Sequence, residues 1–194
     1  MFTDSNPYFS VPHSFNAYLS PWPDSSPLPS EFELKSMQSV GLQLLSEVKT
    51  LEDSCLLQLR HLNNDAKAVM EYLKLQSRKV DLVLQYMLEN EVQEGTKHQG
   101  IKFGGSGIDI QSATPLALGS IHKVTIYVRD ELIAILCFAS VSQCQAHPET
   151  PEQWHIGLTF NQILDTDVES LVKASLSVQQ KLLKHRKQAK EQAE

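Results

Sequence analysis

The sequence predicts an α+β protein, in which a long coiled-coil helix precedes a small antiparallel β-barrel that a C-terminal helix closes. Three observations carry this prediction. Residues 30–94 contain no proline and one glycine, and their apolar residues recur at steps of three and four. Residues 101–160 contain short segments rich in β-branched residues, separated by glycine, proline and polar turns. Residues 165–190 form a final amphipathic stretch.

Residues 1–29 hold six of the nine prolines of the chain, interleaved with aromatic residues. Such a segment is neither a helix nor a regular central strand, because proline lacks the N–H group that both structures use. The aromatic residues are too many for a solvated tail. We therefore expect residues 1–29 to form an extended segment packed on the body, with an edge strand around Tyr8 to Val11.

Residues 30–95 are predicted to form one long oligomerisation helix. Ser30 and Glu33 make a capping box at its start, and Gly95 is a suitable stop. Unbroken, the helix would be about 90 Å long, so it cannot fold back on so small a domain and its seam needs another helix. The mean apolar step of about 3.5 residues is typical of a coiled coil. The residues that we expect to carry self-association are Leu44, Val48, Leu51, Leu62, Val69, Leu73, Val80 and Val83.

Two questions about this helix stay open at the level of sequence. Asn63, Asn64 and Asp65 are able to cap a second helix, which would turn the segment into a hairpin. The seam would also suit a bundle within one chain, although the β-rich remainder favours helices from several copies. Leu, Val and Met occupy both seam positions, so the pattern does not distinguish a dimer from a tetramer.

Residues 96–190 are predicted to form the barrel and its closing helix. A glycine loop at 104–107 and a polar turn at 129–131 separate segments with strand patterns, and Val124, Ile126 and Val128 share the face that we take as inward. The expected strands are 101–103, 108–111, 121–128, 132–145 and 153–160. Asp165 to Asp167 cap the last helix, whose basic end suits the helix dipole and is either solvated or in contact with an acidic partner surface.

Three runs in this half of the chain resemble the PilZ domain family, over residues 98 to 188. They are Phe103 to Ile110, Leu116 to Ser120 with the strand that follows, and Ile156 to Phe160 with the closing helix. A long heptad helix attached to the barrel is similar to an atypical, tetramer-forming branch of that family. The resemblance implies a PilZ-like barrel, a role in bacterial cyclic di-GMP signalling and, for the self-association, a tetramer.

The resemblance also implies a ligand, because the usual task of the family is to bind cyclic di-GMP through R-x-x-x-R and D/N-x-S-x-x-G motifs. No two arginines of this chain lie four residues apart, and alignment on Gly107 puts Lys102 at the acidic position and Gly104 at the serine position. Lysine cannot accept a guanine N–H. The residues therefore argue against the usual binding mode. An altered site would use Lys102 as a point-charge contact to phosphate within the candidate ligand loop Lys102, Phe103, Gly104, Gly105, Ser106 and Gly107.

Composition limits the other classes of function. A net charge of −6 argues against general nucleic-acid binding. The N-terminus lacks the basic and apolar regions of a signal peptide, and the longest apolar run is too short to span a membrane. Three cysteines without metal spacing are typical of a reduced, cytoplasmic protein.

No residue constellation supports an enzyme, a cofactor or a metal site. The loop Gly104 to Gly107 lacks the Lys-Ser/Thr pair of a phosphate-binding loop. His147 and His155, with Glu149 and Glu152, lack the spacing of metal ligands. We therefore hypothesise a non-catalytic regulatory adaptor whose partners are other copies of itself and an unidentified signalling protein. The alternative is a cyclic di-GMP receptor with a non-standard site; nucleic acid and membrane insertion are not expected.

Overall fold

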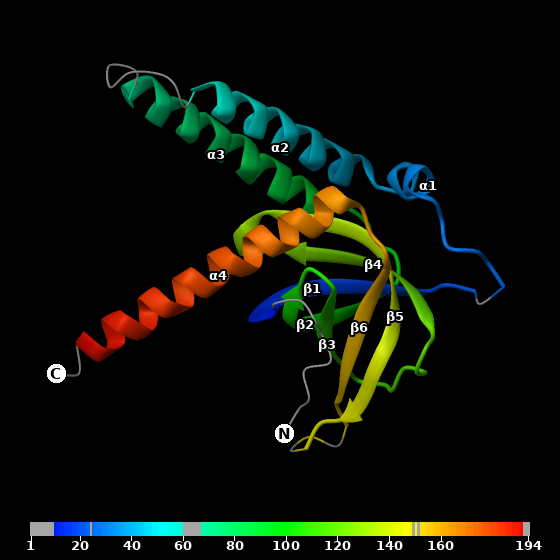
Figure 1. Cartoon of the computed structure of the whole chain (residues 1–194). Helices are drawn as coiled ribbons and strands as arrows, with labels where there is room; N and C mark the ends of the chain where they lie inside the picture. The colour runs from blue at the N-terminus through cyan, green and yellow to red at the C-terminus, as the bar shows by residue number, and fades with distance from the viewer. Residues whose placement is uncertain (1–9, 24, 60–66, 149, 151, 192–194) are drawn as a thin grey trace. The chain divides into compact units, whose positions relative to one another are not determined.

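The computed structural model describes residues 10–23, 25–59, 67–148, 150 and 152–191. The chain divides into two compact units, one made of Met1–Leu34 with Glu94–Glu194 and the other of Lys35–Gln93. The first unit contains a barrel and a long C-terminal helix, and the second contains a pair of helices (Figure 1). Within the described residues, no helix is long and apolar enough to cross a membrane.

The first unit is a closed barrel of six antiparallel strands, which confirms the predicted fold class. The strand order around the barrel is β1-β2-β3-β6-β5-β4. The strands are β1 (Ser10–Pro21), β2 (Thr96–Gly104), β3 (Gly107–Ser112), β4 (Ile121–Val128), β5 (Ile133–Ala146) and β6 (Trp154–Gln162). A short 3-10 turn, η2 (Arg129–Glu131), connects β4 to β5 where the polar turn was expected.

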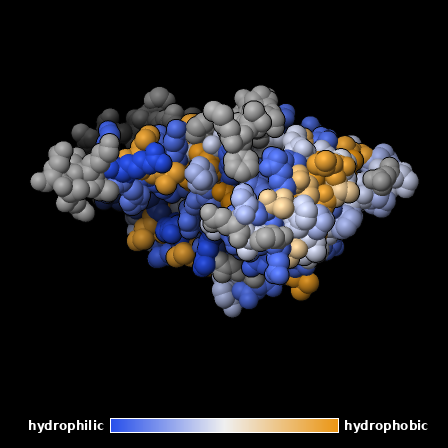
Figure 2. All heavy atoms as spheres, turned by 90° about the horizontal axis from the view of Figure 1, so that it is seen from below, coloured by the Kyte–Doolittle hydropathy of each residue, from blue (hydrophilic) through white to orange (hydrophobic). Residues whose placement is uncertain are grey.

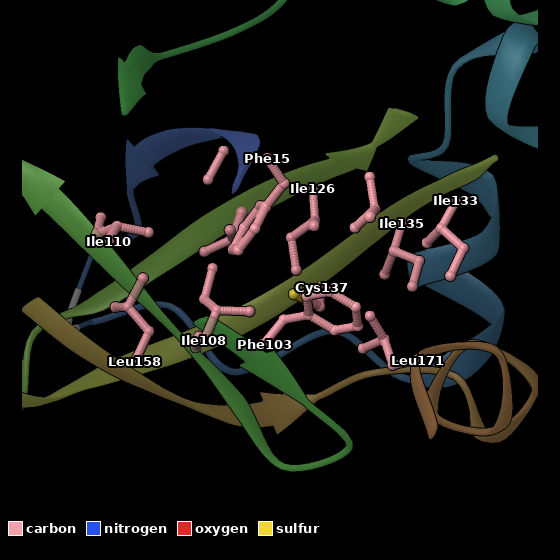
Figure 3. Close-up of a cluster of buried hydrophobic side chains, with 14 of the residues drawn as sticks. Phe15, Phe103, Ile108, Ile110, Ile126, Ile133, Ile135, Cys137, Leu158 and Leu171 are labelled. Atoms are coloured by element: carbon pink, nitrogen blue, oxygen red, sulfur yellow. The ribbon is translucent and has the colours of Figure 1, made fainter. Parts of the chain in front are cut away.

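Alternation along the strands builds the interior of the barrel. Val124, Ile126 and Val128 are fully buried, which confirms the predicted inward face of β4. Side chains from all six strands meet them, including Phe15, Phe103 and Leu158 (Figure 3). The long strand β5 shifts register against β6 after Phe138 and again after Val141, so its pairing is irregular.

Helix α4 (Asp165–Glu191) closes one end of the barrel. It contacts β1, β2 and β5, and its buried residues Leu171, Ala174 and Val178 belong to the barrel core. These positions are three and four residues apart, so they lie on one face of the helix. The predicted closing helix is therefore confirmed.

The N-terminal segment differs from the edge strand that we expected. Its described part forms β1, which pairs with β2 on one side and β4 on the other. Pro12 lies at a register shift before the pairing with β4 begins, and Pro21 is the last residue of the strand. Neither proline therefore interrupts the doubly paired part of the strand. Tyr8 and Phe9, where the edge strand was placed, lie outside the described residues.

The predicted single helix over residues 30–95 is wrong in its continuity. The segment contains α1 (Glu31–Ser36), α2 (Val40–Leu59) and α3 (Lys67–Asn90). The capping box at the start is present: Ser30 N donates to Glu33 Oε2 at 2.8 Å, and Glu33 N donates to Ser30 Oγ at 3.3 Å. Helix α2 then begins with a cap of its own, because Leu42 N donates to Ser39 Oγ at 3.2 Å.

Helices α2 and α3 form an antiparallel hairpin (Figure 1). Ser39 bonds Glu91 near one end, and Glu52 bonds Ser77 midway along the helices. The break that we allowed at Asn63 to Asp65 lies outside the described residues, between the two helices. Gly95 is not the helix stop; α3 ends at Asn90, and Gly95 makes the turn into β2 with a φ of 93°.

Two histidines near the end of the barrel away from α4 give the fold a pH dependence. His98 lies opposite Ala17 and His122 opposite Ala139, and both alanines are fully buried. Burial lowers the pKa of both histidines below the usual 6.5, and the pKa of His122 is lowered further by His98. In the unfolded chain both histidines keep a pKa of about 6.5, so the unfolded state binds protons more readily than the folded state. The free energy of unfolding is therefore highest above about pH 6.5 and decreases as the pH falls below that value.

We predict that His122→Gln reduces this loss of stability between pH 7 and pH 5. The measurement is urea unfolding at a series of pH values, compared as slopes rather than as absolute stabilities. His185→Gln is the matched control, because His185 is exposed on α4. An unchanged slope in His122→Gln would show that the buried ring does not control the acid response.

Candidate functional site

The hairpin buries four leucines, Leu42 and Leu45 of α2 and Leu84 and Leu88 of α3. The helices approach closely at one end, where a Cβ added to Gly41 would lie 2.8 Å from Leu88 Cδ2 and 2.4 Å from Glu91 Oε1. Glu91 accepts hydrogen bonds there from Ser39 Oγ at 2.7 Å and from Gly41 N at 2.9 Å. The carboxylate at the end of α3 thus caps the N-terminus of α2.

Acidic side chains also face each other midway along the hairpin. Ser77 Oγ donates to Glu52, and burial raises the pKa of Asp81, with a further rise from Glu52. Arg78 and Lys49 oppose this rise. This polar layer separates the buried leucines near Gly41 and Glu91 from the rest of the hairpin. A polar layer between two helices costs stability but fixes their register.

The predicted seam does not form the interior of the hairpin. Leu51, Val69 and Val83 have exposed fractions of 65%, 57% and 67%, and Leu44, Leu73 and Val80 are also exposed. Val48 is half-buried, and Leu62 lies outside the described residues. The seam is therefore an apolar surface of the single chain. The buried leucines were missed, although Leu45 beside Leu44 and Leu84 beside Val83 were a signal for a second apolar face.

A second exposed stripe runs along α3. Its members are spaced by three, four and seven residues and are all more than half exposed: Tyr72, Leu75, Leu82 and Tyr86. At about 100° per residue, the centre of this stripe lies about 110° around the helix from the centre of the seam residues of α3. Lys74 and Arg78 are exposed on a third side of α3, away from both stripes. Figure 2 shows one face of the molecule, on which hydrophobic side chains lie in small patches among hydrophilic ones.

The candidate ligand loop lies at the end of the barrel that α4 closes. Lys102 stands opposite Asp109 across β2 and β3, so the two opposite charges share the outer face. Phe103 is fully buried and packs edge-on against Phe15. Gly104 is the last residue of β2 and is also buried. Only Lys102 and Ser106 of the loop are partly accessible side chains.

The glycines of this loop are explained by packing. A Cβ on Gly105 would lie 2.8 Å from Val172 Cγ2 of α4, and a Cβ on Gly107 would lie 2.2 Å from the carbonyl oxygen of Leu158 in β6. The turn is held further by Phe160 N, which donates to the carbonyl oxygen of Ser106 at 3.0 Å. Glycine is therefore required so that α4 and β6 can approach the turn.

A histidine–aspartate pair and a buried cysteine are further candidates for a reactive site among the described residues. His155 Nε2 lies 3.3 Å from Asp109 Oδ2, and among the described residues no three His, Cys, Asp or Glu side chains are placed to hold a metal. Glu149, one of the acids weighed as a metal ligand, lies outside those residues. Burial raises the pKa of the Cys137 thiol, which keeps it protonated and unreactive.

Comparisons with known proteins identify the fold. No protein-family profile matches the chain, and no curated protein matches it. A solved Xanthomonas campestris protein, described as a tetrameric PilZ domain self-assembled via an unusual helical bundle, is similar with a TM-score of 0.55 and 12% identity. The match covers 94% of this chain and 92% of that chain. The chain therefore has a PilZ-like fold, as its motifs indicated.

Two further structures match part of the chain. The Bacillus subtilis inhibitor of motility MotI/DgrA has a TM-score of 0.41 and 19% identity over 47% of this chain and 45% of that chain. MrkH of K. pneumonia has a TM-score of 0.40 and 15% identity over 49% of this chain and 42% of that chain.

We predict that Gly107→Ala lowers the free energy of unfolding by about 2 kcal/mol, since the new methyl group must displace backbone atoms. Thr159→Ala is the control, because Thr159 pairs with Gly107 but is exposed; it should cost less than about 1 kcal/mol. Both values come from urea unfolding followed by circular dichroism. Equal stability of Gly107→Ala and the wild type would contradict the packing role of this glycine.

Proposed function

We propose that this chain is a non-catalytic regulatory protein of cyclic di-GMP-type signalling, which self-associates through its hairpin and acts by protein contacts. The observation that carries the proposal is the pair of exposed apolar stripes on α3. Monomeric proteins rarely leave contiguous apolar surface in water, and such surface marks an interaction site. The PilZ-like fold supports the signalling class, and the cytoplasm is the proposed location.

The seam stripe is suited to helix–helix contact. Its α3 members, Val69, Leu73, Val80 and Val83, follow the heptad spacing, and each is between 44% and 67% exposed. Gln76 interrupts the stripe with one polar side chain, which is a common device for fixing register. Burying these side chains against another copy is favourable by roughly 25 cal/mol for each Å² of apolar area removed from water.

The angle between the stripes bears on the number of copies. A helix in a two-stranded coiled coil needs one contact face, whereas a helix in a closed ring needs two. The angle between those faces is about 60° in a ring of three, about 90° in a ring of four and about 108° in a ring of five. The separation of about 110° on α3 is too wide for three copies and lies nearest to the angle for five, with four next. The similar Xanthomonas campestris structure is described as a tetramer, which supports four.

We predict that Val83→Glu converts the oligomer to smaller species that approach the 21.8 kDa of one chain. Val83 is 67% exposed in the single chain, so a carboxylate there does not damage the isolated hairpin but is buried on assembly. Tyr86→Glu tests the second stripe in the same way. Light scattering coupled to size exclusion gives the mass of each variant.

Lys74→Glu is the matched control, because Lys74 lies on the third side of α3, away from both stripes, and is exposed. It should keep the mass of the wild type. A monomeric wild type would sink the proposal, and an oligomer that survives both Val83→Glu and Tyr86→Glu would move the interface away from α3.

The alternative function, a cyclic di-GMP receptor with an altered site at Lys102 to Gly107, has less support. Asp109 stands opposite Lys102 and would repel a phosphate that approached the lysine. The space beside Gly105 and Gly107 is filled by residues of α4 and β6. A charge-only contact also lacks the bidentate geometry of an arginine fork.

We predict that calorimetric titration with cyclic di-GMP yields no saturable heat at micromolar protein. Asp109→Asn is the informative variant, since it removes the repulsive charge while keeping the size of the side chain. Saturable binding to the wild type that disappears in Lys102→Ala would favour the receptor function over the adaptor.

A further inference from the structure

Helix α4 continues well past the barrel that supports it. Its first half is anchored by Leu171, Ala174, Ser175 and Val178, whereas residues 180–188 are all exposed. The ion pair of Lys181 Nζ with Glu131 Oε1, at 2.6 Å, ties the helix to η2 just beyond these anchors. Figure 1 shows the remaining turns extending beyond the barrel. A helical segment whose side chains are exposed is only marginally stable by itself.

The extension is strongly basic in an acidic chain. Residues 179–191, to the end of α4, hold five of the 17 lysines and arginines and one acidic residue, Glu191, which leaves twelve basic against 22 acidic residues elsewhere. Lys181 is paired, but within the described residues we find no ion pair for Lys184, Arg186 or Lys187. The tip thus carries a concentrated positive charge.

An apolar stripe lies beside this charge. Val172, Leu176 and Leu183 are 37%, 49% and 49% exposed, and their spacing of four and seven places them along one side of α4. Lys184 and Lys187 flank one edge of the stripe, and Arg186 flanks the other. Leu183 therefore lies among the basic residues of the helix end, and Leu176 and Val172 continue the same side toward the barrel, where Val172 lies beside the turn at Gly105.

We propose that this half of α4 docks on an anionic phospholipid surface. Clusters of four or more lysines and arginines on an amphipathic helix are attracted to negatively charged headgroups, and the leucines enter the boundary below them. Ten residues from Leu182 reach about 15 Å, which exceeds the Debye length of about 8 Å at physiological salt. The tip can thus touch the membrane while repulsion of the acidic body is screened.

Two features favour lipid over an acidic protein. Four of the five basic residues are lysines, a residue type that is depleted in protein interfaces and that contacts phosphate as a point charge. The stripe also contains only aliphatic residues, with no aromatic anchor of the kind that dominates protein hot spots. The predicted contact is peripheral and reversible, and it involves no insertion across the bilayer.

The test uses the full chain and vesicles of phosphatidylglycerol with phosphatidylcholine, compared with vesicles of phosphatidylcholine alone. Co-sedimentation should detect binding to the anionic vesicles only, weakening as salt is raised. Lys184→Glu with Lys187→Glu should lower the affinity about tenfold or more, because each basic residue near the surface contributes several-fold. Leu176→Ser with Leu183→Ser should weaken the binding that remains at high salt.

Lys35→Glu with Lys97→Glu is the matched control, since both residues are exposed, lie outside α4 and change the net charge equally. This control should bind like the wild type. Absence of binding to anionic vesicles, or equal losses in both charge variants, would overturn the proposal. Binding to polyglutamate without binding to vesicles would assign the tip to an acidic protein instead. Light scattering should give the α4 variants the mass of the wild type, which would show that their loss of vesicle binding does not come from a loss of self-association.

Discussion

The pairing of β1 with β2 is the constraint on which the rest of the structure depends. Leu19 stands opposite Thr96, so the chain leaves the barrel and returns to it at neighbouring positions of one antiparallel pair. The whole helical segment is therefore an insertion between two hydrogen-bonded strands. The return is tight: a Cβ on Gly95 would lie 2.3 Å from the carbonyl oxygen of Leu19. The aromatic ring of Phe15 packs on Gly100 farther along the same pair and helps to hold the register.

This constraint explains the main error of the sequence prediction. A continuous helix of about 90 Å would place its ends too far apart for the eight residues after Pro21 to bridge, since an extended chain spans at most about 3.5 Å per residue. The prolines of the first segment concealed a barrel strand. Once β1 is placed between β2 and β4, a hairpin is required. Tertiary pairing of this kind is invisible to local periodicity.

The strands that follow were easier to predict because their information is local. Alternating β-branched residues specified the inward face of β4, and Asp165 to Asp167 marked the start of α4. The loop at Gly104 to Gly107 was less readable, since a glycine run suits both a ligand and a close contact. Only the positions of Val172 and Leu158 decide between them, and those neighbours are distant in sequence. The second stripe on α3 was also missed, because the sequence does not show which apolar residues of α3 are buried and which stay exposed. Leu84 and Leu88 are buried, whereas Leu75 and Leu82 are exposed.

An insertion whose two ends share one strand pair has a consequence for how such a protein can diverge. Equal numbers of helical turns added to α2 and α3 lengthen the hairpin without moving any barrel strand, because the entry and exit points stay fixed by β1 and β2. Each added turn extends the hairpin by about 5.4 Å. The barrel and the length of its attached hairpin are thus separately adjustable traits, and selection can change the hairpin while the barrel keeps its sequence requirements.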